Sequence, residues 1–126
     1  RKSVFPQFLT DQPVSKEIIN ELLEAANLAP SHKKTEPWRF RVYTGAGRAK
    51  LTQSIKEVYE AARAPEVRNP KVVPKFAAKV EHAPVVMAIF LHRDPEDSIP
   101  EWEEVAAVGG AVENLWLSLY QYTRAC

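Results

Sequence analysis

The pattern of apolar and polar positions predicts three helices separated by two strands. In the segment 15–29, SKEIINELLEAANLA, apolar residues recur at helical spacing behind Ser15, a residue type common at helix N-caps. Pro30 ends this helix, because proline disfavours the helical conformation in the residue before it. The helical period returns in 47–63 and, over the longest stretch, in 101–124.

Two shorter segments have the character of strands. Residues 38–43, WRFRVY, alternate apolar and basic, which predicts a half-covered strand. Residues 83–91, APVVMAIFL, are apolar on both faces, which predicts a strand buried at the centre of a sheet. The stretch 65–74 has three prolines and no clear period, so we expect a surface loop there. This order of elements is typical of a layered α/β or α+β fold with helices packed on a sheet.

Composition narrows the possible partners and location. A chain of 126 residues with net charge +1 is expected to form a single domain over 1–126, with no basic face for nucleic acid or an anionic membrane. Its single cysteine, Cys126, favours a reducing compartment and hence the cytoplasm. The longest apolar run is too short to cross a bilayer. Because the sequence has no initiator methionine and stops inside a helical pattern, we expect it to be incomplete at both ends.

The last predicted helix contains an unusual pair, Gly109 and Gly110. Two glycines inside a helix cost on the order of 1 kcal/mol each relative to alanine, so close approach of another helix or of a flat ligand is expected to compensate. The helix is apolar nearly all round and carries Trp102 and Trp116. This composition suits a subunit interface, and it equally suits a buried central helix.

Familiar catalytic motifs are absent from the sequence. His32, His82 and His92 do not have metal-ligand spacing, so each is interpreted as a surface or hydrogen-bonded histidine, and no metal site is expected. Nothing marks Cys126 as a nucleophile. The carboxylates of EWEE, residues 101–104, are interpreted as a solvated first turn whose charge favours the helix dipole.

Two polar clusters remain as candidates for ligand binding. In the first, Arg1 offers a planar fork suited to phosphate or carboxylate, Lys2 a point charge and Ser3 a small donor. An exposed basic tail would have the same composition. The second cluster lies in the connection after the first helix, where polar side chains could hydrogen-bond a planar ring system and Trp38 could support it. An ordinary solvated loop is the alternative for this connection.

Taken together, the clusters resemble a known family. The segments RKSVFPQF, LLEAANLAPSHKKTEPWRFRVYTG and GGAVENLWLSLYQ are similar to the FMN-dependent nitroreductase family, over essentially the whole chain. The connection resembles the branch of the family that has a histidine two residues after the proline, where His32 stands.

The resemblance implies an α+β, nitroreductase-like three-layer fold with an antiparallel or mixed central sheet flanked by helices. It also implies a homodimer formed through long central helices, with FMN at two sites along the dimer interface. In the family the opening arginine and serine hold FMN, the arginine at the phosphate, and the connection reaches the FMN of the other subunit. The cofactor-binding candidates carried over in this way are Arg1, Lys2, Ser3, Leu28, Ser31, His32, Lys33, Lys34 and Glu36.

The sequence departs from the family pattern at two of these positions. Lys34 and Glu36 stand where many relatives have asparagine and glutamine before Pro-Trp. A lysine near the N1–C2=O region of a flavin would stabilise its anionic reduced form. The family's remaining FMN contacts, in a Gly/Trp-containing loop and a basic carboxy-terminal segment, lie beyond Cys126.

The implied activity is transfer of a hydride from NAD(P)H, through FMN, to a nitroaromatic, a quinone or a similar acceptor. Because the cofactor carries the chemistry, no side chain is named as a catalytic residue. One alternative keeps the fold and the flavin but assigns another reaction, such as dehydrogenation, dehalogenation or flavin breakdown. Another is a dimeric binding or structural protein without flavin.

Overall fold

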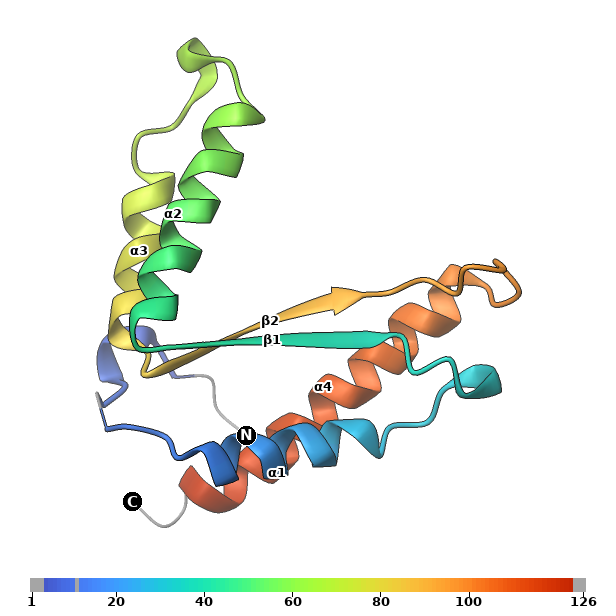
Figure 1. Cartoon of the computed structure of the whole chain (residues 1–126). Coiled ribbons are helices and arrows are strands. Elements are labelled where there is room, and N and C mark those ends of the chain that lie inside the picture. The colour runs from blue at the N-terminus through green and yellow to red at the C-terminus, as the bar shows by residue number, and fades with distance from the viewer. Residues whose placement is uncertain (1–3, 11, 124–126) are drawn as a thin grey trace. The chain divides into compact units, whose positions relative to one another are not determined.

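The computed structural model describes residues 4–10 and 12–123, and Figure 1 shows their arrangement into helices and strands. Arg1, Lys2, Ser3 and Cys126 lie outside the described residues. The described elements are the α-helices α1 (Lys16–Asn27), α2 (Ala46–Ala61), α3 (Val72–His82) and α4 (Glu101–Thr123), the strands β1 (Trp38–Thr44) and β2 (Val85–Leu91), and the 3-10 turns η1 (Pro6–Phe8), η2 (His32–Lys34) and η3 (Pro65–Val67). The α+β class predicted from the sequence is confirmed.

One helix was not predicted. The sequence pattern assigned residues 65–74 to a loop, yet α3 begins at Val72. Pro74 is the third residue of this helix, within the first turn, where the missing amide hydrogen of proline has no intrahelical partner to lose. The prolines that indicated a loop are therefore compatible with a helix that starts among them.

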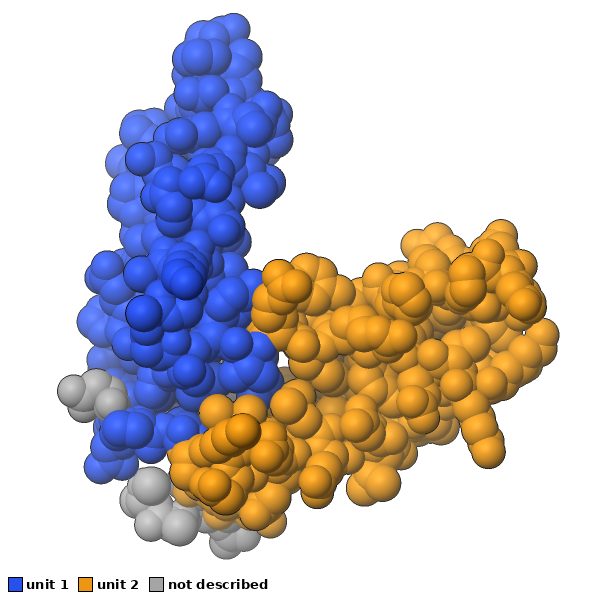
Figure 2. Space-filling view, viewed as in Figure 1, with its two compact units in different colours: residues 1–14, 42–87 blue, residues 15–41, 88–126 orange. Residues whose placement is uncertain are grey.

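The described chain divides into two compact units, which Figure 2 shows in different colours. Unit 1 comprises Arg1–Val14 and Val42–Met87, and unit 2 comprises Ser15–Arg41 and Ala88–Cys126. In unit 1, α2 packs along α3, and η1 contacts α3. In unit 2, α1 packs along α4.

The α1–α4 contact contains most of the buried side chains. Small residues, Ala26 and Ala29 on one segment and Ala107 and Ala111 on α4, let the two backbones approach closely, and Trp38 packs with them. Phe40, Val108 and Leu115 lie partly buried around this cluster. The helix α1 begins where the sequence predicts, because the Ser15 hydroxyl oxygen accepts a hydrogen bond from the Ile18 amide at 3.3 Å.

The strands β1 and β2 form a two-stranded antiparallel sheet. Beside one end of this pair, the His92 amide donates to the Pro37 carbonyl at 2.8 Å. The prediction that β2 is a central strand is wrong for the described residues, because β1 is its single neighbour there and Phe90 is 49% exposed. Apolar composition on both faces shows that a strand tolerates burial. It does not specify how many neighbours cover the strand.

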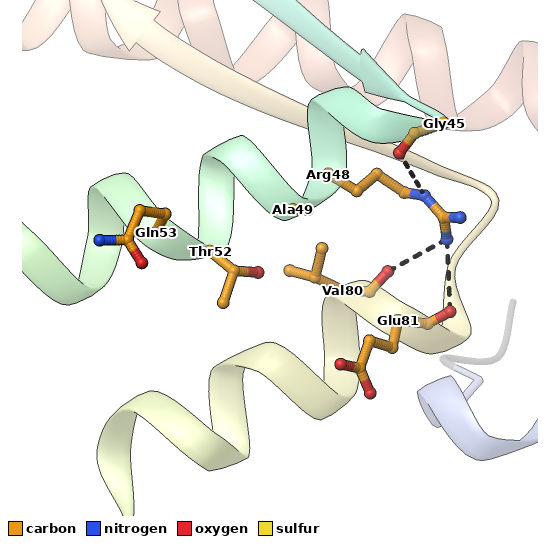
Figure 3. Close-up of a pocket in the computed structure, with 7 residues that line it drawn as sticks. All are labelled: Gly45, Arg48, Ala49, Thr52, Gln53, Val80 and Glu81. Atoms are coloured by element: carbon orange, nitrogen blue, oxygen red, sulfur yellow. Dashed lines mark hydrogen bonds between the residues drawn. The ribbon is translucent and has the colours of Figure 1, made fainter.

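In unit 1, one arginine of α2 bonds to the end of α3. The Arg48 guanidinium donates to the carbonyls of Val80, Glu81 and Ala83 at 3.4, 3.3 and 2.6 Å. Carbonyls at the end of a helix lack intrahelical donors, so Arg48 of α2 caps the carboxyl end of α3. Figure 3 shows two of these bonds.

In the described part of the chain, no helix is long and apolar enough to span a membrane.

Candidate functional site

The connection between α1 and β1 is a specifically folded segment. Lys33, Lys34 and Glu36 have φ values of 51°, 56° and 44°, in the left-handed region that costs residues with side chains roughly 1 kcal/mol or more. Within the segment, the Ser31 hydroxyl oxygen accepts from the Glu36 amide at 3.1 Å, and the Thr35 hydroxyl donates to the His32 carbonyl at 3.2 Å. The backbone of this exposed connection is therefore held by hydrogen bonds within the segment.

Long-range contacts tie the connection to the segment around the start of α4. Nδ1 of His32 lies 2.6 Å from Oε2 of Glu103, and Nζ of Lys33 donates to Oγ of Ser98 at 3.3 Å. The partners are separated by 71 and 65 residues in the sequence. The connection is therefore positioned by tertiary contacts.

The first turn of α4 is anchored by a buried carboxylate. The Glu104 residue is only 1% exposed, and its carboxylate accepts from the Arg93 guanidinium and, at 2.7 Å, from the Asp94 amide. Arg93 also pairs with Asp97 at 2.6 Å and with Glu101 at 3.0 Å. The hydrogen bond to Glu104 is the main cause that raises the pKa of Arg93. The interpretation of the whole EWEE segment as a solvated turn is thus wrong for Glu104, which needs a cation to be buried.

The loop between β2 and α4 is ordered by Asp94. Oδ2 of this carboxylate accepts from the Ser98 hydroxyl at 2.6 Å and from the Ser98 amide at 2.9 Å. The hydroxyl hydrogen bond is the largest cause that lowers the pKa of Asp94, followed by the amide bond. Since Ser98 also accepts from Lys33, this loop links the connection to the Glu104–Arg93 pair.

A hollow of about 520 Å³ lies between the connection and the first half of α4. This volume is within the range of small-molecule sites, about 300–1,000 Å³. One wall is formed by the connection and the other by α4; the lining residues are Pro30, Ser31, His32, Trp102, Glu103, Ala106, Ala107 and Gly110. The hollow therefore combines small apolar residues with a few convergent polar groups.

One glycine of the α4 pair, Gly110, contributes to this surface. A methyl group built at Gly110 would lie 3.8 Å from the Ala29 Cβ, an ordinary contact, and one built at Gly109 would meet nothing within 4 Å. The packing of this chain therefore does not itself require glycine at either position. At Gly110 the missing side chain leaves bare helix backbone along the hollow.

The structure brings together some of the candidate residues and leaves others apart. Ser31 and His32 line the hollow, whereas Leu28, Lys33, Lys34 and Glu36 are exposed residues outside its lining. Leu28, the C-cap of α1, is 82% exposed. The remaining candidates, Arg1, Lys2 and Ser3, lie outside the described residues.

Sequence reasoning missed Glu103 as a site residue. It lies in the segment interpreted as solvated, and no local spacing relates it to His32. Among the described residues no group of three or more His, Cys, Asp or Glu side chains could hold a metal ion.

A second hollow, of about 310 Å³, lies beside α2 and α3 in unit 1 (Figure 3). Its one guanidinium, that of Arg48, is directed toward backbone carbonyls of the chain itself. This guanidinium is therefore already bonded within the chain, whereas Thr52, Gln53 and Glu81 are the other polar residues of the lining.

Comparisons with known proteins agree on one family. The sequence model of the Nitroreductase family matches residues 1–122. A nitrobenzene nitroreductase from Ectopseudomonas oleovorans is 48% identical over 52 residues, which are 41% of this chain and 23% of that protein.

Solved structures show the same fold. A nitroreductase-like family protein from Bacillus cereus superposes with a TM-score of 0.77 at 29% identity, over 97% of this chain and 61% of that one. A protein from Desulfovibrio desulfuricans, solved in complex with FMN, superposes with a TM-score of 0.63 at 28% identity, over 90% of this chain and 55% of that one. The chain thus spans less than two thirds of the length of each of these relatives.

Proposed function

Since this chain belongs to the nitroreductase family, we propose that the whole protein is an FMN-dependent oxidoreductase. It would move a hydride from NAD(P)H, by way of FMN, to a nitroaromatic, a quinone or a similar acceptor. The observation that carries this proposal is the hollow beside Ser31 and His32, at the connection where the family resemblance expects flavin contacts. The FMN bound in the Desulfovibrio desulfuricans relative supports the choice of cofactor.

The residues of the hollow suit a planar, polar ring system. Ala106, Ala107 and the bare backbone at Gly110 provide a flat apolar surface, while Ser31 and His32 provide hydrogen-bonding groups at its edge. When bound, FMN would supply hydride transfer, for which no amino-acid side chain is equipped. The protein would supply orientation, charge and exclusion of water.

The proposed cofactor-binding residues divide by role. Arg1, Lys2 and Ser3 would hold the phosphate end, Arg1 through a charge-assisted, forked contact. The residues of the connection, Leu28, Ser31, His32, Lys34 and Glu36, would contact the FMN that is bound chiefly by the other subunit. The location proposed for this enzyme is the cytoplasm, because the sequence has a single cysteine.

Flavin binding is tested by titrating the purified protein with FMN and following absorbance and quenching of flavin fluorescence. We expect saturable binding. Arg1→Ala should weaken it by about 1.5 to 3 kcal/mol, through loss of a hydrogen bond to a charged group. Arg63→Ala, at an exposed arginine next to α2, is the matched control and should leave the affinity unchanged.

The outcomes of this titration separate the alternatives. A protein that binds no FMN would contradict the proposed function and favour the flavin-free binding protein. If FMN binds and Arg1→Ala binds it equally well, Arg1 is not a cofactor ligand. Steady-state assays with NADH and NADPH against a nitroaromatic and a quinone then test the reaction. Bound FMN without turnover would favour another flavin reaction on the same fold.

A homodimer is part of the proposal, and α4 carries its interface. Exposed apolar side chains follow one face of this helix at helical spacing; they are Trp102, Val105, Trp116, Leu117 and Tyr120, with exposures of 70, 52, 39, 54 and 49%. Gly109 lies on the same face, near its middle, where another helix could approach the backbone. A second copy of α4 is the proposed occupant of this face.

The dimer is tested with Gly109→Leu. No atom of the described residues lies within 4 Å of a Cβ built at this exposed position. Replacing a helical glycine also favours the helix by about 0.5 to 1 kcal/mol, so the variant monomer should fold. We expect sedimentation velocity to show a dimer for the wild type and a monomer for this variant. Gly47→Leu, the same exchange on α2, should remain dimeric. An unchanged dimer for Gly109→Leu would refute this placement of the interface.

A further inference from the structure

The contact between His32 and Glu103 has no role in the function proposed above. Nδ1 of His32 lies 2.6 Å from Oε2 of Glu103. An ionised carboxylate can only accept hydrogen bonds, so the hydrogen of a neutral ring must be on Nδ1. Among the described residues, no protein group bonds to the other ring nitrogen, Nε2. Both side chains line the hollow of about 520 Å³.

Glu103 is held on a rigid part of the fold. It directly precedes Glu104, whose buried carboxylate is bonded to Arg93 and to the Asp94 amide. These bonds fix the first turns of α4, and the Glu103 side chain itself is only 27% exposed. The Glu103 carboxylate is therefore held close to one position, because its backbone is fixed and most of its side chain is covered.

His32 is fixed from its own side as well. The Thr35 hydroxyl donates to the His32 carbonyl, and the residue after His32, Lys33, has a φ of 51° and reaches Ser98. The backbone on the carbonyl side of His32 is thus held in place. The His32 side chain is 51% exposed, so its contact with Glu103 is the interaction that orients the ring.

We propose that Glu103 is a positioning residue that holds His32 in the Nδ1–H tautomer, so that Nε2 is presented as a hydrogen-bond acceptor to a ligand in the hollow. The tautomer of a histidine is set by the bond that its other nitrogen makes, and here that bond is to Glu103. The ligand class that fits such an acceptor is a planar molecule with an N–H or O–H at its edge. Only the identity of that ligand as FMN rests on the function proposed above.

The test is a measurement of the ring-nitrogen signals of His32 by long-range ¹H–¹⁵N correlation in the ¹⁵N-labelled protein, at an alkaline pH at which these signals no longer change with pH. We expect the wild type to show the Nδ1–H pattern. Glu103→Ala should convert His32 to a mixture in which the Nδ1–H form is the minority. Glu103→Gln keeps an acceptor oxygen and should restore the wild-type pattern in large part.

Glu101→Ala is the matched control, because it removes a carboxylate from the same turn that pairs with Arg93 and not with His32. It should leave the His32 signals unchanged. A wild-type Nε2–H pattern, or a Glu103→Ala pattern identical to the wild type, would overturn the proposal. Circular dichroism shows whether each variant keeps its helices. These spectra need no FMN, so a wild type that binds no flavin would contradict the proposed function and leave this result standing.

Discussion

The two units of the chain are stabilised in different ways. Every buried apolar side chain among the described residues belongs to unit 2, except Val80 of α3. The helix α2 has no buried residue at all. Unit 2 therefore has a conventional core between α1 and α4, whereas unit 1 is a helical hairpin with little burial.

The two units also differ in the partners of their polar side chains. In unit 2, side chains bond to other side chains that lie 71 and 65 residues away in the sequence, as in His32–Glu103 and Lys33–Ser98. In unit 1, Arg48 and Arg68 bond mainly to backbone carbonyls. Side chains that must hold a ligand need rigid support, so the candidate site is expected where the packed core and the side-chain network coincide.

The distribution of tryptophans gives a direct way to observe this contrast. All three tryptophans of the sequence, Trp38, Trp102 and Trp116, belong to unit 2. Tryptophan fluorescence therefore reports on unit 2 alone, while far-UV circular dichroism reports on the helices of both units. Since the two units are stabilised differently, substitutions and changes of solvent should affect the fluorescence and the circular dichroism transitions to different extents.

The largest effect is expected from Trp38→Ala. This side chain is 4% exposed, packs in the alanine cluster and donates through Nε1 to Oδ1 of Asn27 at 2.8 Å. Truncation of a buried tryptophan costs about 3 to 5 kcal/mol of unfolding free energy, from lost burial and the cavity left behind. Urea unfolding followed by circular dichroism measures this loss.

The comparison residue for Trp38 is Val58 of α2, which is 68% exposed. Val58→Ala should change the unfolding free energy by less than about 0.5 kcal/mol, as is usual at exposed positions. Comparable losses for the two variants would show that unit 1 is covered and packed as well as unit 2, and the contrast would then fail.

A smaller effect is expected from Ser15→Ala, which removes the N-cap of α1 and leaves the Ile18 amide without its side-chain acceptor. Loss of such a cap costs about 0.5 to 2 kcal/mol. Ser54→Ala, within α2, is the matched control. Because alanine is the better helix former by up to about 0.7 kcal/mol, this control should be neutral or slightly stabilising. Both variants are compared by thermal unfolding. If both substitutions lowered or both raised the melting temperature, the capping role of Ser15 would be contradicted.

The smallest effect is expected from acid. A hydrogen bond from its own amide, and then one from Ser15, lowers the pKa of Glu17. The Ser98 hydroxyl likewise lowers the pKa of Asp94. A carboxyl with a lowered pKa adds stability above its ordinary pKa, and this stability is lost as the pH falls through the folded-state value. Both groups belong to unit 2. The urea midpoint of unfolding, followed by tryptophan fluorescence, should therefore decrease as the pH is lowered from about 5 to about 2.

Ser98→Ala sharpens the acid experiment. It removes the main cause of the Asp94 shift, so the variant should be less stable than the wild type near neutral pH and converge with it as Asp94 is protonated. A stability difference that stays constant over the whole acid range would show that Asp94 is not the group responsible.

Much of the secondary structure followed from the sequence, and the exceptions have identifiable physical causes. The helix after Ser15 and the strand beginning at Trp38 lie where the periodicity predicts them, because their patterns reflect contacts within a few residues. The start of α3 was missed because Pro74 is read as a helix breaker, although proline is tolerated in a first turn. The central position predicted for β2 was wrong because an apolar composition does not specify how many strands lie beside it.

The candidate site was predictable only in outline. The sequence by itself determined that the connection after α1 is rich in polar groups and resembles a flavin-binding segment, since residue types and short spacings are local properties. Only the tertiary structure decided that His32 meets Glu103 and that Glu104 is buried against Arg93. The packing of α1 on α4 brings His32 and Glu103 together across 71 residues of sequence, and no local pattern encodes a contact over that distance.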